Sequence, residues 1–137
     1  MDVTESDVAG LPPGNIRVAR QEFASVWRTA SAHDLESPGD WYAAAVATTC
    51  RWLATAPARL PNGTAGLLRS PATRREGVAY EELVEAEYLA AERLEQRRPS
   101  LARSRPGWCD GVRDTLRCTW RREGPAPYEV RQEQVAG

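Results

Sequence analysis

Apolar residues recur every three or four positions along four stretches of the chain, which is the period of a helix with one buried face. The four predicted helices cover residues 15–34, 37–54, 77–97 and 106–122. The second is apolar nearly all round, which indicates a central position among the others. The pattern therefore predicts an all-α fold, namely an irregular four-helix domain with a long loop between the second and third helices.

Residues suited to helix ends lie beside these stretches. Asn15 is the expected N-cap of the first helix, because its side chain can accept a hydrogen bond from a free amide of the first turn. Ser37 is the expected cap of the second helix, with Pro38 at its first position. Pro99 is expected to stop the third helix, since proline cannot continue one.

Proline and glycine also divide the chain into segments. Residues 1–14 end in Gly-Leu-Pro-Pro-Gly and are expected to form a flexible lead-in to a single helical domain over residues 15–127. Residues 128–137 are expected to be a polar tail, with its first three residues lying against the domain. Residues 57–75 form the long loop, which contains several prolines and glycines, and a loop of that length is often functional.

Composition narrows the classes of function. The chain has 137 residues and a net charge of −1, and all 18 of its basic residues are arginine. A dedicated non-specific nucleic-acid binder is normally basic overall, so this balance argues against that class. The first residues lack a secretory signal and no apolar run is long enough to span a membrane, so we expect a cytoplasmic protein that binds no membrane.

Arginines gather in the last quarter of the chain. Between residues 97 and 122 there are eight arginines and only two acidic residues, a local net charge of +6. Arg113, Arg117 and Arg121 are spaced by four and therefore lie along one helix face. This arginine ridge predicts a contact with phosphate, nucleic acid or an acidic partner. The alternatives are a solvated face, or pairing with the glutamates of the helix at 81–95.

The long loop carries a second candidate binding surface. Arg69, Arg74 and Arg75 lie close together at its end. Since arginine can grip a carboxylate or phosphate with two parallel hydrogen bonds, these three are also predicted partner-binding residues.

Motifs for catalysis and metal binding are missing from the sequence. Glutamates at 81, 85, 92 and 95 are not followed by the histidine that a carboxylate metal site in a helical bundle requires, and His33 is the only histidine. Cys50, Cys109 and Cys118 form no Cys-x-x-Cys pair and are interpreted as reduced, packed thiols. The sequence has no phosphate-binding or nucleophile-elbow motif. We expect no cofactor and no metal, although an enzyme of an unfamiliar type stays open because distant residues can converge.

Three segments carry a resemblance to known proteins: DWYAAAVATTCRWLA at 40–54, RSPATRR at 69–75, and YEEL with EAEYLAAERL between 80 and 94. Over residues 38–128 the chain resembles small uncharacterised actinomycete proteins that are often encoded on or near mobile elements. The resemblance implies an accessory or regulatory role and supplies no site residues.

These observations favour a non-enzymatic accessory or regulatory interaction protein that binds the acidic surface of another protein through its arginine-rich last helix. The alternative is a DNA-binding transcriptional regulator that would place the same helix in the major groove. The net negative charge and the lack of helix-turn-helix spacing argue against that alternative.

Overall fold

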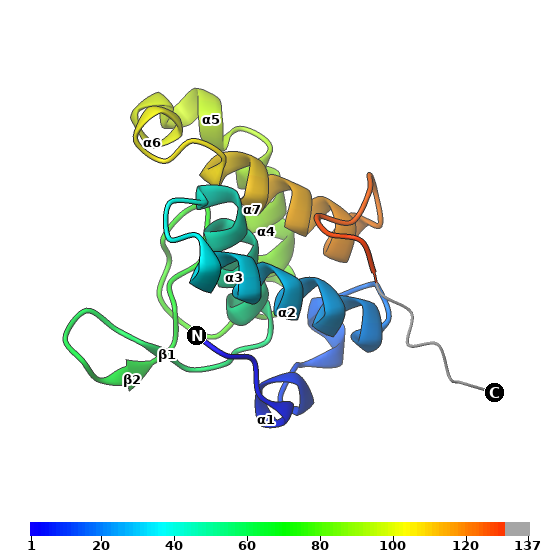
Figure 1. Ribbon diagram of the computed structural model, residues 1–137. Coiled ribbons are helices and arrows are strands. Elements are labelled where there is room, and N and C mark those ends of the chain that lie inside the picture. Colours follow the sequence, from blue (N-terminus) through cyan, green and yellow to red (C-terminus); the bar gives the residue numbers. More distant parts are fainter. Residues whose placement is uncertain (131–137) are drawn as a thin grey trace.

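The computed structural model describes residues 1–130, and most of them are helical (Figure 1). The longest helices are α2 (Arg20–Glu36), α3 (Trp41–Leu53), α4 (Glu81–Ala91) and α7 (Trp108–Leu116). The shorter helical elements are α1 (Glu5–Ala9), η1 (Pro13–Asn15), α5 (Leu94–Arg97), α6 (Pro99–Ser104) and the π-helical turn η2 (Arg117–Arg121). Within residues 1–130, none of the helices is both long enough and apolar enough to cross a membrane.

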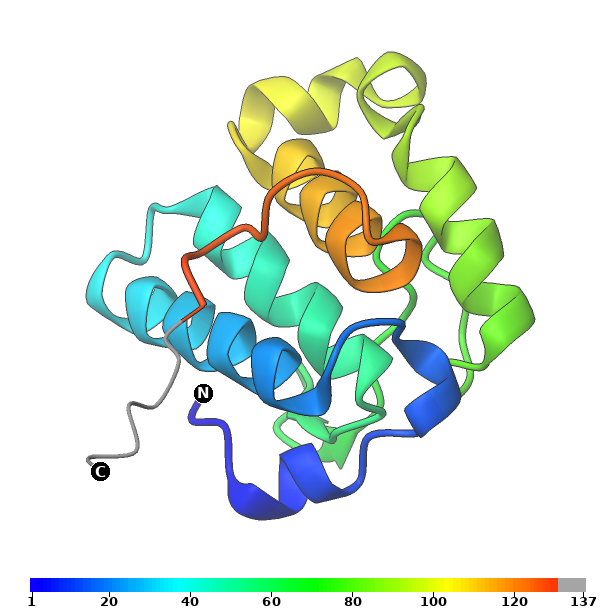
Figure 2. The same cartoon turned by 90° about the vertical axis from the view of Figure 1, so that its right-hand side faces the viewer.

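Helix α3 lies between α2 and α7, in the central position that its apolar sequence predicts (Figures 1 and 2). Its alanines let the neighbouring helices approach closely, and Gly111 of α7 does the same from the other side. A methyl group on Gly111 would lie only 2.7 Å from the Cβ atom of Ala45 and 2.8 Å from the carbonyl oxygen of Tyr42. The crossing of α3 and α7 therefore requires glycine at position 111.

Two of the predicted helix starts are wrong. Asp40, not Ser37, caps α3, because its carboxylate accepts a hydrogen bond from the amide of Ala43 at 3.0 Å. Asn15 is buried rather than at a helix start, and its side-chain amide donates to the carbonyl oxygens of Leu53 (2.8 Å) and Ala79 (3.1 Å). This amide satisfies carbonyl groups of two other segments, a task that local sequence cannot reveal.

Residues 1–14 differ from the flexible lead-in expected for them. Thr4 caps α1 by accepting from the amide of Asp7 at 3.1 Å, and the Asp7 carboxylate accepts from the amide of Thr4 at 3.0 Å. The side chain of Leu11 is 2% exposed and belongs to the core. The buried guanidinium of Arg51 lies 3.5 Å from Asp7. An apolar contact and an ion pair thus fasten this segment to the rest of the protein.

The connection between α3 and α4 contains a small hairpin. Strands β1 (Ala58–Arg59) and β2 (Ala65–Gly66) pair in the antiparallel sense. The fold is mostly helical, as the sequence predicts, and this hairpin is the part that an all-α prediction misses. Four of the five tryptophans are buried in the core, and Trp41 is half-buried against it.

The chain turns sharply where the third predicted helix was expected to end. Pro99 does not simply stop that helix, because it begins α6, where proline is tolerated in the first turn. Gly107, with φ of +98°, then turns the chain into α7. Figure 2 shows α5 and α6 at one end of the molecule, from which α7 runs toward the middle.

The segment after η2 returns across α2 and α3. The ring of Tyr128 stacks on His33 with 5.1 Å between ring centroids and meets Tyr42 edge-on at 6.0 Å. Val130 also packs against the core, so the expected contact of residues 128–130 with the domain is confirmed. The rest of the predicted tail, residues 131–137, lies outside the described residues.

Candidate anion-binding pocket

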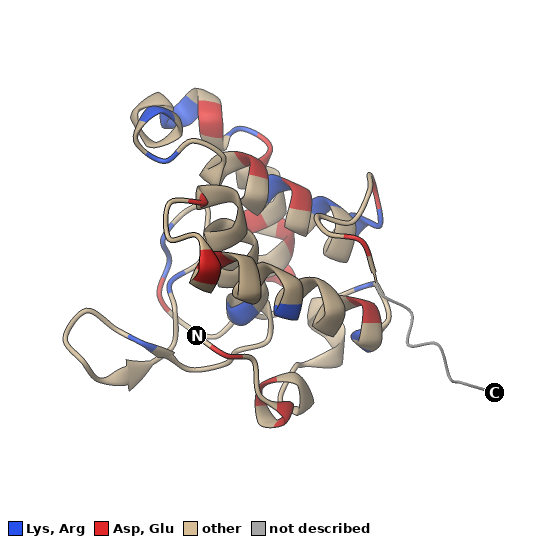
Figure 3. Ribbon diagram, viewed as in Figure 1, with Lys and Arg blue, Asp and Glu red and all other residues tan. Residues whose placement is uncertain are grey.

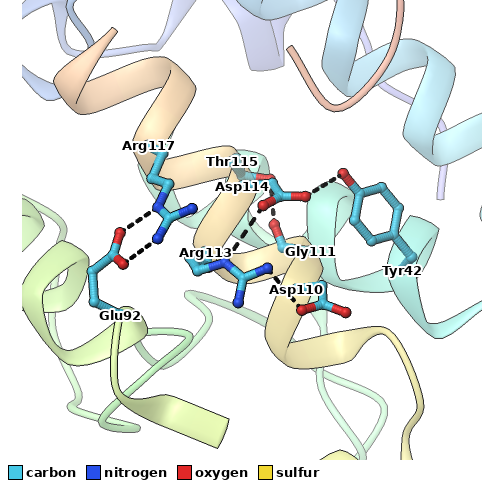
Figure 4. Close-up of polar contacts among 8 residues, drawn as sticks. All are labelled: Tyr42, Glu92, Asp110, Gly111, Arg113, Asp114, Thr115 and Arg117. Carbon is cyan, nitrogen blue, oxygen red and sulfur yellow. Dashed lines mark hydrogen bonds and ion pairs between the residues drawn. The ribbon is translucent and has the colours of Figure 1, made fainter. Parts of the chain in front are cut away.

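The arginine ridge is paired within the molecule. Arg117 forms two hydrogen bonds with the carboxylate of Glu92, both of 2.5 Å, and Arg121 binds Glu85 at 2.9 Å (Figure 4 draws the first pair). The pairs join η2 to α4 and to Glu92, the C-cap residue that directly follows α4, and we call these four side chains the seam. Of the alternatives that the sequence left open, the structure selects pairing with the glutamates between residues 81 and 95.

Arg113, the third member of the ridge, pairs within its own helix. Its guanidinium lies 2.8 Å from Asp110 and 3.6 Å from Asp114 (Figure 4). Asp114 also accepts a hydrogen bond from the hydroxyl of Tyr42 at 2.9 Å. The side chain of Arg113 therefore contributes little free positive charge to the surface.

The electrostatics of the seam follow from this pairing. The hydrogen bonds from Arg117 hold the pKa of Glu92 below its usual value, and the same bonds raise the pKa of Arg117. Trp120 donates its indole N–H to Glu85, and the guanidinium of Arg121 lies 4.7 Å from the ring centroid of Tyr88. The seam is therefore a packed contact between helices.

The three predicted loop arginines have different surroundings. Arg69 binds Glu76 at 2.7 Å. Arg74 and Arg75 are exposed, and neither side chain forms an ion pair with an acidic residue in the described part of the chain. Arg74 also has a positive φ of 60°, which places it at a sharp bend of the loop. Of this group, Arg74 borders a pocket.

That pocket lies between the loop and α6 and has a volume of about 450 Å³. Arg74, Arg98 and Arg105 line it together with Ser100 and Ser104, and the hydroxyl of Ser104 donates to the carbonyl oxygen of Leu101 at 3.4 Å. Its remaining lining residues are Pro71, Leu101 and Trp108. None of the lining residues is acidic, and none of the three arginines forms an ion pair within residues 1–130. Figure 3 shows basic positions along α5 and α6 at this end of the molecule.

The loop side of the pocket is held by a buried glutamate. Glu87 of α4 has no exposed surface, and its carboxylate accepts hydrogen bonds from the amides of Ala72 (2.8 Å) and Thr73 (3.0 Å) and from the hydroxyl of Thr73 (2.5 Å). A carboxylate bound by three donors can remain buried. Glu87 thereby fixes the loop immediately before Arg74.

Sequence reasoning missed Glu87, although a signal was present. The buried residues of α4 and α5 lie at 83, 84, 87, 91 and 94, and position 87 falls on that stripe at helical spacing. A charged residue on a buried stripe indicates a specific partner, because an unpaired charge there is too costly.

The other side of the pocket is held by aromatic stacking. The guanidinium of Arg105 lies 5.1 Å from the ring centroid of Trp41 and 5.3 Å from that of Trp108. The two indoles meet edge-on at 6.5 Å. Such cation–π contacts orient Arg105 without neutralising its charge, so the charge remains available to a ligand.

A larger hollow, of about 610 Å³, follows the outer face of α2. Its lining includes both Arg28 and Glu36, and Arg28 lies 3.7 Å from Glu5. Because charges of both signs line this hollow, it has no concentration of positive or negative charge that would select a charged ligand. We therefore select the arginine-lined pocket, although it is the smaller of the two.

The cysteines and acidic residues form no reactive or metal-binding group in the described part of the chain. Cys50, Cys109 and Cys118 are free thiols, and burial raises the pKa of each, which disfavours the reactive thiolate. No three His, Cys, Asp or Glu side chains among residues 1–130 come together in a way that could hold a metal ion.

Comparisons of the chain with models of known protein families, with curated proteins and with solved structures found no match. The resemblance to actinomycete proteins of mobile elements therefore stays a prediction from the sequence.

Proposed function

We propose that this protein is a non-enzymatic interaction protein that binds an acidic group of a partner protein in the pocket formed by Arg74, Arg98 and Arg105. The observation that carries the proposal is that three arginines line one pocket that has no acidic lining residue. Positive charge that is not neutralised within the molecule is free to attract an anionic partner.

The proposed binding surface is not on the arginine-rich last helix, which the sequence favours. Arg117 and Arg121 already bind Glu92 and Glu85, so a partner would have to replace those carboxylates. The arginines of the pocket require no such exchange. Arg75, which is exposed beside Arg74, adds to the positive field around the pocket.

The pairing of the seam also weighs against the DNA-binding alternative. A recognition helix needs several side chains free to reach base edges and phosphates. The basic side chains of α7 and η2 are instead paired with Asp110, Glu92 and Glu85.

A binding measurement with a hexaglutamate peptide tests the proposal. We expect binding by the wild-type protein that weakens as salt is raised from about 50 to 300 mM, because exposed charges are screened over about 10 Å at 0.1 M ionic strength. Arg98→Gln combined with Arg105→Gln should abolish it. Arg103→Gln is the matched control, since Arg103 is an exposed arginine on α6 that does not line the pocket.

Two outcomes would overturn the proposal. One is no binding at low salt of either hexaglutamate or a small phosphate monoester, and the other is equal loss of binding in the control and in the pocket variants. A duplex DNA oligonucleotide that bound tightly while the peptide did not would make the DNA-binding regulator the better assignment.

A further inference from the structure

We infer that the group held in the pocket is a phosphomonoester dianion, carried on a serine or threonine of the partner protein; this inference rests on the function proposed above.

The donors of the pocket exceed what a carboxylate can use. Each of Arg74, Arg98 and Arg105 carries five N–H donors in a planar fork, and Ser100 adds a hydroxyl. A carboxylate has one charge and two oxygens, whereas a phosphomonoester has a charge of about −1.5 to −2 at pH 7 and three terminal oxygens. Three cations without an acidic neighbour are therefore better balanced by phosphate than by a carboxylate.

The surroundings of the tryptophans argue against a nucleotide. Proteins that bind single-stranded nucleic acids stack the bases on exposed aromatic rings. Here the guanidinium of Arg105 stacks on both Trp41 and Trp108, and the side chain of Trp108 is only 8% exposed. The pocket thus offers charge and a hydroxyl donor without a free aromatic surface for a base.

Contacts within the protein hold two of the three arginines in place. Glu87 holds the loop that carries Arg74 through three hydrogen bonds, and two indoles hold Arg105. Less conformational freedom is then lost on binding, which favours a compact ligand over a long acidic surface. Pro71 and Leu101 line the same pocket and can contact the carbon atoms next to the phosphate.

The test compares two small probes, N-acetyl-O-phosphoserine amide and N-acetyl-glutamate amide, by titration into isotope-labelled protein at pH 7.5 and pH 5.0. The second pKa of a phosphomonoester is about 6, so the apparent affinity for the phosphoserine probe should fall about tenfold at the lower pH. The glutamate probe should change less than about twofold, because its pKa is about 4.3. The residues that line the pocket include no histidine, aspartate or glutamate.

Matched variants assign the binding to the pocket. Arg98→Gln should weaken the phosphoserine probe at least tenfold, whereas Arg103→Gln, which makes the same change of charge outside the pocket, should weaken it less than twofold. Equal effects of the two variants would overturn the inference. So would binding of inorganic phosphate without binding of the phosphoserine probe.

Different experimental results would overturn this inference and the proposed function. Hexaglutamate binding that Arg98→Gln abolishes, without any preference for the phosphoserine probe or any change with pH, overturns the phosphate assignment and leaves the function intact. If neither hexaglutamate nor the phosphoserine probe binds, both are wrong.

Discussion

Two regions of this protein are rich in arginine, and they use it differently. In the seam, Arg117 and Arg121 are opposite Glu92 and Glu85. Around the pocket, Arg98 and Arg105 have no such carboxylate within the described residues. All four arginines come from the same strongly basic stretch of sequence. The comparison teaches that the number of charges does not locate a binding surface, whereas their pairing within the fold does.

The largest loss of stability is expected from a change at Glu87, the buried carboxylate that holds the loop side of the pocket. Glu87→Ala would leave the amides of Ala72 and Thr73 without their acceptor and would open a cavity. We expect a loss of about 3 kcal/mol in the free energy of unfolding, since each unsatisfied buried donor costs about 1–3 kcal/mol. Chemical denaturation would measure it.

Glu82→Ala is the control for that change, because Glu82 is exposed on the same helix. It should alter the free energy of unfolding by less than about 0.5 kcal/mol. A loss below about 1 kcal/mol for Glu87→Ala would contradict the anchoring role.

A smaller effect on stability is expected when the Arg117–Glu92 pair of the seam is removed. A double-mutant cycle with Arg117→Gln and Glu92→Gln should give a coupling free energy of about 0.5–1 kcal/mol, because both side chains are partly exposed. Urea denaturation of the four proteins would give the value. A coupling of zero would mean that the seam contributes no stability, and the contrast between the two regions would then be lost.

The seam should also depend on pH. Because Arg117 lowers the pKa of Glu92 in the folded protein, the pair stabilises the fold above the ordinary value of 4.5, and this contribution is lost as the pH falls below 4.5 through the lowered pKa. The difference in stability between the wild type and Glu92→Gln should therefore shrink as the pH falls from about 5 toward 3. Thermal unfolding at a series of pH values would follow it, and a difference that grew in acid would contradict the sign.

The smallest effect on stability is expected at the pocket. Arg98→Gln removes an exposed side chain with no acidic partner in residues 1–130, so the free energy of unfolding should change by less than about 0.5 kcal/mol while anion binding is lost. Calorimetry and a binding titration on the same sample would separate the two. A large loss of stability would mean that Arg98 supports the fold rather than binding a partner.

The sequence predicts the helices better than their contacts. The apolar spacing located most of each of the four longest helices and the central place of α3, because helical periodicity is a local property. It was wrong to run the third helix unbroken from residue 77 to residue 97, since the structure has α4 over Glu81–Ala91 and the separate α5 over Leu94–Arg97. Asn15 and Pro99 were misjudged, since a side chain can satisfy a distant carbonyl and a proline can begin a helix as well as end one.

The candidate site was predicted only in part. The sequence predicts Arg74 as a binding residue, but it presents Arg98 and Arg105 only as part of a charged stretch. Whether an arginine is free depends on which carboxylate folds against it, and the partners of Arg117 and Arg121 lie 25 and 36 residues away. Periodicity within one helix carries no information on that pairing.

The carboxylate of Glu87 also has a consequence for the motions of the protein. It binds the amides of Ala72 and Thr73, which lie in a loop outside any helix or strand. Loop amides usually exchange their hydrogens with water quickly, but these two can do so only when the loop separates from α4. Their exchange rates should therefore match those of α4 rather than those of neighbouring loop residues. The loop and α4 would then open as one cooperative unit, and the shape of the pocket would persist for as long as that helix remains folded.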